Sequence, residues 1–69
     1  MVRCKMVCSW KDVGKGTVYL HPVYSGSKEN EEFFSATPGG NVVLHILNER
    51  AIEQFEQGKE YYLDFVRAE

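Results

Sequence analysis

The chain has 69 residues, of which 43% are hydrophobic and 26% are charged. These fractions are typical of a globular domain and exclude a disordered chain, and no apolar run approaches the ~20 residues of a membrane-spanning helix. We therefore expect one small domain over residues 1–69, with no membrane partner. The net charge is −2 and the basic residues are scattered, whereas nucleic-acid-binding surfaces concentrate them, so nucleic acid is a disfavoured partner.

Residues 2–10 alternate in polarity, which predicts a half-buried strand. Its inward face is expected to carry Val2, Cys4, Met6, Cys8 and Trp10. Four residues of extended chain span about 13 Å at ~3.3 Å per residue, well beyond the ~7 Å limit for a disulfide. The two cysteines are therefore expected to be free, buried thiols.

Residues 11–16 supply turn formers, and residues 17–25 resume with β-branched and aromatic side chains. Together with the first strand they predict an antiparallel hairpin. Pro22 has no backbone donor, so we expect the second strand either to lie at a sheet edge there or to carry a bulge near Pro22.

A loop and a short helix are predicted next, with Ser27 as the helix N-cap and with Phe33 and Phe34 anchoring one or two helical turns to the sheet. The Thr-Pro-Gly-Gly sequence at residues 37–40 then predicts a tight turn. Pro38 suits its first central position, and Gly39 suits the second because glycine accepts a positive φ.

Residues 42–47 predict a strand with apolar side chains on both faces, which indicates a central strand or a contact surface. Asn48 is expected to cap a second short helix that ends at Gly58, and residues 59–67 form the last strand.

The predicted order is β-β-α-β-α-β. A mainly β chain with two short helices suits a small curved antiparallel sheet or a partly open barrel of the SH3-like or OB-like kind.

Alternation in the three later strands places several polar side chains on the outward face of the sheet. The tentative binding residues there are Tyr19, His21, His45, Tyr62 and Asp64. Two imidazoles and a carboxylate suit zinc binding or proton transfer. The preferred interpretation is a half-apolar second surface of the sheet, since a one-residue slip would turn His21 to the other side, so no metal or other cofactor is expected.

Two further features of the sequence could bind a ligand but are better explained by structural roles. Gly39 and Gly40 precede a strand, not a helix N-terminus, so a turn is preferred over a phosphate cradle, although their backbone remains a place for a ligand or partner chain to approach. Five aromatic residues suit base stacking, but in so short a chain most are expected in the core: Trp10, Tyr19, Tyr24, Phe33 and Phe34.

No catalytic signature is present. Cys4 and Cys8 lie on the inward face of a strand, where thiols are protonated, and no serine lies in a Gly-x-Ser-x-Gly turn. We therefore expect a protein that is not an enzyme. Self-association is expected because the half-apolar outward face carries Val43, Leu47, Tyr62 and Val66, a large exposure for so small a domain.

Four segments of the chain carry a resemblance to other proteins. They are Val-Arg-Cys-Lys-Met at 2–6, Pro-Val-Tyr-Ser-Gly-Ser-Lys-Glu-Asn-Glu-Glu-Phe-Phe at 22–34, Thr-Pro-Gly-Gly at 37–40 and Phe-Glu-Gln-Gly-Lys-Glu-Tyr-Tyr-Leu-Asp-Phe at 55–65. In this combination the chain resembles a group of small uncharacterised proteins of tailed bacteriophages. The resemblance implies a phage origin and action in the host bacterial cytoplasm or in the virion, and it carries no catalytic residue.

Three functions follow as expectations. The first is a non-enzymatic phage binding protein, for example a counter-defence protein that binds a host protein or sequesters a nucleotide immune signal. The alternative is a virion component that decorates the capsid or joins its parts. A single-stranded nucleic-acid-binding module is the third, and it suits the predicted fold better than the charge. The absence of an apolar leader after Met1 favours the host cytoplasm as the location.

Overall fold

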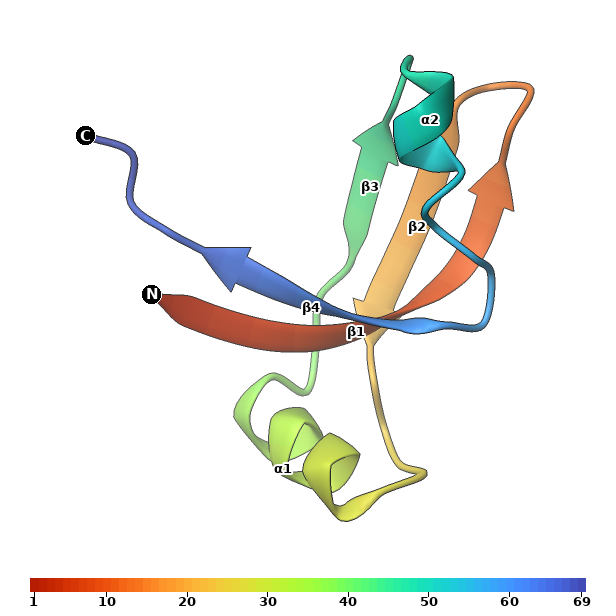
Figure 1. Cartoon of the computed structure of the whole chain (residues 1–69). Coiled ribbons are helices and arrows are strands. Elements are labelled where there is room, and N and C mark those ends of the chain that lie inside the picture. The colour runs from red at the N-terminus through yellow and green to blue at the C-terminus, as the bar shows by residue number, and fades with distance from the viewer.

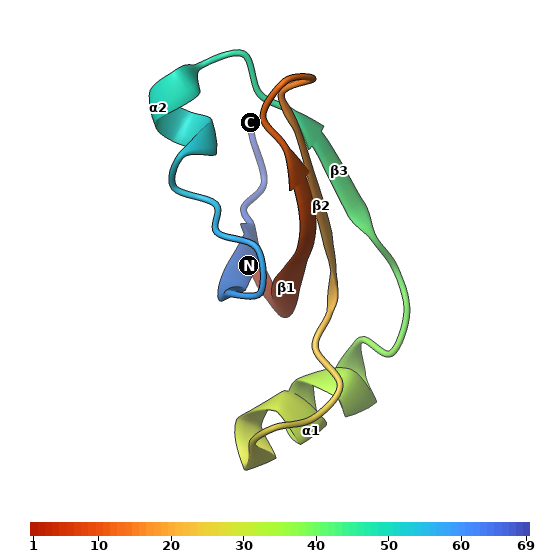
Figure 2. The ribbon, with the colours of Figure 1, turned by 90° about the vertical axis from the view of Figure 1, so that its right-hand side faces the viewer.

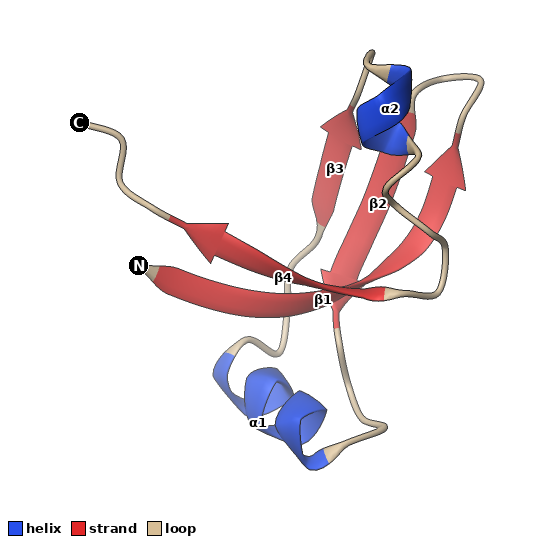
Figure 3. Ribbon diagram, viewed as in Figure 1, coloured by secondary structure: helices blue, strands red, loops and turns tan.

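The computed structural model describes residues 1–69 and contains one sheet and two short helices (Figure 1). The elements are β1 (Val2–Asp12), β2 (Thr17–Pro22), α1 (Lys28–Ala36), β3 (Val42–His45), α2 (Glu49–Ile52) and β4 (Glu60–Phe65). All four strands pair antiparallel, in the spatial order β3-β2-β1-β4, and the sheet curls into a half-barrel (Figure 3). This confirms the predicted mainly β fold and its order of elements. Neither helix has the length and apolar character that crossing a membrane would require.

β1 is shared between two partner strands. It pairs with β4 from Val2 to Val7 and with β2 from Met6 to Asp12, and the register against β2 shifts between Cys8 and Trp10. Ser9 is therefore an extra residue, a β-bulge, which bends the strand and increases its twist. The long curved path of β1 in Figure 1 follows from this bend.

The bulge lies at Ser9 on β1, so the prediction of a bulge near Pro22 on β2 is wrong. The alternative prediction, that β2 lies at a sheet edge at Pro22, is confirmed. The backbone N–H of Val23 donates to Lys5 O on β1, so alternation turns the nitrogen of Pro22 to the other side of β2. β3 pairs with β2 only along Thr17–Leu20, so no strand lies beside Pro22 on that side. The missing N–H therefore breaks no ladder bond.

The core lies on the concave side of the sheet, beneath α2 (Figure 2). Its buried side chains are Cys4, Met6, Cys8, Val18, Leu20 and Ile52. Both thiols are free, as predicted, and burial raises the pKa of Cys8 above its ordinary value, which keeps this thiol protonated. Trp10 is not among these residues. The extra residue at Ser9 turns Trp10 to the opposite face, so the prediction that it faces inward is wrong.

The helices begin as predicted but end elsewhere. The Ser27 side chain accepts from the N–H of Asn30, and the Asn48 side chain accepts from the N–H groups of Arg50 and Ala51. α2 ends at Ile52 instead of continuing to Gly58. The N–H of Gly58 donates to Cys8 O at 2.8 Å, so this residue brings the chain back alongside β1 before β4 begins.

The segment around the Gly-Gly pair is also different from its prediction. Gly40, with φ at 126°, takes the positive φ that was expected of Gly39. The chain here makes an open bend at Gly39 in place of a tight hydrogen-bonded turn. β3 follows, and it is an edge strand, so the central position considered for it is wrong and the contact-surface alternative remains.

Replacing Leu20 by alanine should lower the free energy of unfolding by about 2–5 kcal/mol, because Leu20 is 3% exposed and a cavity would remain. Leu47→Ala is the matched control, since Leu47 is 95% exposed, and it should change stability by no more than about 0.5 kcal/mol. Urea unfolding of both variants measures the difference. Equal losses would contradict the described core.

Gly16→Ala should destabilise the fold by at least about 1 kcal/mol. Gly16 has φ at 64°, and a Cβ there would lie 2.8 Å from the backbone oxygen of Ile46. Gly14→Ala in the same turn is the control, because its Cβ would meet nothing closer than Asp12 Oδ1 at 3.4 Å. Thermal unfolding should separate the two variants, and identical midpoints would argue against the close approach of Gly16 to Ile46.

Candidate functional site

The register of the strands shows which predicted site residues share a face. We call the side of the sheet opposite α2 the outer face. Tyr19 lies opposite Val43, and Thr17 lies opposite His45. On the other half of the sheet Arg3 lies opposite Asp64, and Lys5 lies opposite Tyr62. All five strand residues predicted to point outward therefore lie on the outer face: Tyr19, His21, His45, Tyr62 and Asp64.

These residues are not gathered into one site. Asp64 accepts hydrogen bonds from Arg3 Nε at 2.6 Å and Nη2 at 2.9 Å. His45 lies on β3, at the edge of the sheet opposite β4, and its Nδ1 is 3.3 Å from the Thr17 hydroxyl. No three histidine, cysteine or acidic side chains lie close enough to hold a metal ion, so the arrangement of His21, His45 and Asp64 considered from the sequence is not assembled.

Tyr62 joins the sheet to α1 through a polar network. Its hydroxyl donates to Glu29 Oε1 at 2.6 Å, and Lys5 Nζ donates to Glu29 Oε2 at 3.2 Å. The guanidinium of Arg3 lies 4.8 Å from the centre of the Tyr62 ring, and the Phe33 ring lies 6.1 Å away. The hydrogen bond from Tyr62, followed by that from Lys5, lowers the pKa of Glu29 below its ordinary value. Tyr62 and Asp64 are thus held by partners within the chain.

The other half of the outer face carries exposed rings. We call Trp10, Tyr19, His21, Tyr24 and Phe34 the aromatic strip. Trp10 stacks on Tyr19 with the ring centroids 5.5 Å apart and the planes at 16°. Further along, the ring of Tyr24 lies 5.6 Å from His21 and 5.7 Å from Phe34.

The strip is open to solvent, because Trp10 is 53% and Tyr24 is 59% exposed. The expectation that most of these aromatics belong to the core is therefore wrong. Sequence reasoning missed the strip because alternation across an unseen bulge assigns Trp10 to the wrong face. Val43, opposite Tyr19 on β3, continues the strip to the edge of the sheet and is 46% exposed.

Cations on this side of the molecule are engaged. Arg3 is held by Asp64, and Lys5 lies 3.2 Å from Glu29 and 3.5 Å from Glu60. Lys11 lies on the other side of the sheet, opposite Val18, and donates its amine to the backbone oxygen of Phe55 at 2.9 Å. Arg3 and Lys5 are therefore paired with carboxylates, and Lys11 faces away from the strip, so β1 offers no unpaired cation to phosphate groups beside it.

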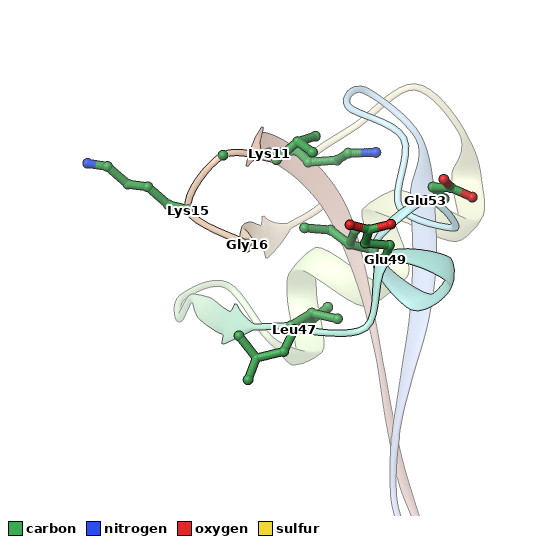
Figure 4. A pocket seen from close by; sticks show the side chains of 10 residues that line it. Lys11, Lys15, Gly16, Leu47, Glu49 and Glu53 are labelled. Atoms are coloured by element: carbon green, nitrogen blue, oxygen red, sulfur yellow. The ribbon is translucent and has the colours of Figure 1, made fainter.

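A groove lies on the other side of the molecule, with the β1–β2 turn on one side of it and α2 on the other. It has a volume of about 490 Å³ and is lined by residues that include Lys11, Gly16, Leu47, Glu49 and Glu53 (Figure 4). Figure 4 shows the amine of Lys15 pointing away from it. The groove carries charges of both signs, and its lysine at position 11 is already hydrogen-bonded, so it selects neither an anion nor a cation. Gly39 and Gly40 lie elsewhere, on the exposed connection from α1 to β3.

Tyr62→Phe removes the hydrogen bond that contributes most to the low pKa of Glu29, so this pKa should rise toward its ordinary value. The pKa of Glu29 is lower in the folded than in the unfolded state, so the hydrogen bonds to Glu29 stabilise the fold fully at pH values above the unfolded-state pKa. This stabilisation is lost as the pH falls through the folded-state pKa. Carboxyl NMR titration measures the change. Tyr61→Phe, which removes a hydroxyl bonded to Gln54 O and Glu56 N, is the control and should leave the Glu29 titration unchanged.

Two surfaces thus compete as the functional site: the aromatic strip and the groove beside α2. The strip combines exposed rings with a rigid sheet, whereas the groove is charged with both signs. Comparison of the chain with protein-family models, with curated proteins and with solved structures finds no match. The chemistry of the two surfaces therefore has to distinguish them as candidate sites.

Proposed function

We propose that this chain is a non-enzymatic binding protein that contacts a partner protein through the aromatic strip. The observation that carries this proposal is the solvent-exposed ring of Trp10, stacked on the half-buried ring of Tyr19 on the outer face. Rings of this kind supply large contact areas with few rotatable bonds, and tryptophan and tyrosine are enriched at the energetic centres of protein interfaces. The sheet and the stacking of Trp10 on Tyr19 position these two rings before the partner arrives, which lowers the entropic cost of binding.

A protein partner suits the strip better than a nucleic acid does. Stacking alone could hold single-stranded bases, but phosphate neutralisation supplies most of the affinity in such complexes. Arg3 and Lys5 are paired with acidic side chains, and the chain carries a net charge of −2. A nucleotide signal would need the same free cations. The host-protein version of the proposed counter-defence role is therefore preferred over sequestration of a nucleotide.

The resemblance to small proteins of tailed bacteriophages supports a phage origin and a target in the host cytoplasm. A virion component is the competing alternative to this proposal, because a capsid protein would also use a ring-rich surface to bind its neighbours. Self-association belongs to the proposal as well, since the apolar side chain of Val43 is exposed at the sheet edge.

Trp10→Ala should abolish binding of the partner while leaving the fold intact, because Trp10 is on the surface. The test is affinity purification of the tagged chain from infected host cells, followed by reconstitution with the purified partner. Leu47→Ala, which changes an exposed residue of the groove, is the control and should retain the partner. Trp10 is the only tryptophan of the chain, so partner binding should also shift its fluorescence to shorter wavelength.

Three outcomes would contradict the proposal. Loss of the partner on Leu47→Ala but not on Trp10→Ala would assign binding to the groove. Salt-sensitive binding of an oligodeoxythymidine probe that disappears with Trp10→Ala would assign the strip to nucleic acid. Stoichiometric recovery of the chain from purified particles, with no host protein bound, would favour the virion alternative.

A further inference from the structure

The free edge of β3 lacks the features that normally prevent edge strands from pairing. β3 has a partner on one side only, and Figure 2 shows no element lying along its other side. Exposed edges are usually protected by charged side chains, by proline or by a bulge. Residues 41–48 contain no charged residue and no proline, and their pairing with β2 shows no register shift.

The opposite edge of the sheet is different. β4 presents Glu60 and Asp64 within the strand and follows directly on Lys59. Charges of this kind oppose the approach of another strand. The absence of protection is therefore a property of β3 and not of the sheet as a whole.

Backbone hydrogen bonding shows which groups of β3 are free. The N–H of Ile46 donates to Gly16 O on the β2 side at 2.7 Å. In an antiparallel ladder alternate residues bond to the same neighbour, so Leu44 also faces β2, and the backbone groups of Val43 and His45 point to the open edge. These two residues offer donors and acceptors at the spacing of a further antiparallel strand.

We propose that β3 of a second copy of this chain pairs with this edge, antiparallel and about a two-fold axis at Leu44. Residues opposite each other in a sheet point their side chains to the same face, and side chains alternate between the two faces along a strand. When two identical strands pair, the residue numbers of opposite residues must therefore differ by an even number. A register in which Leu44 meets Leu44 and Val43 meets His45 satisfies this rule. In this register the free backbone N–H and C=O groups of Val43 and His45 all bond to the second copy. The register is also centred on the uncharged segment.

A second copy fits this edge better than a strand of an unrelated protein. The uncharged segment of residues 41–47 is symmetric about Leu44, so both strands overlap along their whole length. The charges that give the chain its net −2 lie outside this segment, so two copies meet without like-charge repulsion. Pairing also covers the exposed side chains of Val43 and Leu44.

The resulting assembly would be a continuous sheet with the two aromatic strips on the same face, because the two-fold axis runs perpendicular to the sheet. The inference is independent of what the strips bind. One strand pair buries less than the ~1,600 Å² of a typical stable interface, so we expect a weak dimer whose population rises with protein concentration.

Charge substitutions at the axis test the pairing. Leu44→Lys alone and Leu44→Glu alone should each be monomeric in sedimentation equilibrium, because two like charges would face each other across the axis. An equimolar mixture of the two variants should recover a one-to-one heterodimer. Val13→Lys, at an exposed position on the turn between β1 and β2, is the control and should dimerise as the unchanged chain does.

Two further measurements keep the test decisive if Leu44 variants fold poorly. Val43→Pro removes a donor that faces the open edge and leaves the bonds to β2 in place, so it should give a folded monomer by NMR. In the unchanged chain, amide exchange at Val43 and His45 should slow as concentration rises. The inference is overturned if the unchanged chain stays monomeric at millimolar concentration, or if Leu44→Lys dimerises equally well. Trp10→Ala should still dimerise, which separates this inference from the proposed binding function.

Discussion

The sharing of β1 between β4 and β2 is the constraint on which the rest of this structure depends. β1 pairs with β4 along its first half and with β2 along its second, and the extra residue at Ser9 bends the strand within the second pairing. The same residue reverses the faces of the strand. Cys4, Met6 and Cys8 before the bulge fill the core, and Trp10 after it lies outside. A single insertion in the ladder thus determines both the core and the exposed surface.

The outer face is consequently divided into two halves with different roles. Over β1 and β4, α1 is attached by the network of Lys5, Glu29 and Tyr62, and the charges there neutralise one another. No helix lies along the outer side of β2 and β3 (Figure 2). Beside this uncovered half the exposed rings of Trp10 and Tyr24 are in contact with water. Binding of the proposed partner through the uncovered half would leave the attached half in place.

The sequence predicted those features that depend on neighbouring residues. Alternation located the strands and the outward direction of Tyr19 and His21, and the caps at Ser27 and Asn48 were recognised from residue type. Features that depend on distant partners were missed. The bulge at Ser9 depends on how β1 fits β2, and the edge position of β3 depends on strand order. Asp64 was grouped with the histidines because nothing local reveals that Arg3, 61 residues away, binds it.

The pairing of β1 with β4 also has a consequence for synthesis. Val2 lies opposite Phe65, so the ladder between them joins segments that the ribosome produces far apart in time. Until residues 60–65 have emerged, the apolar side of the first strand lacks a neighbour, and contacts of such long sequence separation form slowly. A product that ended before β4 would therefore leave Val2–Val7 without its neighbouring strand and its apolar side open to solvent.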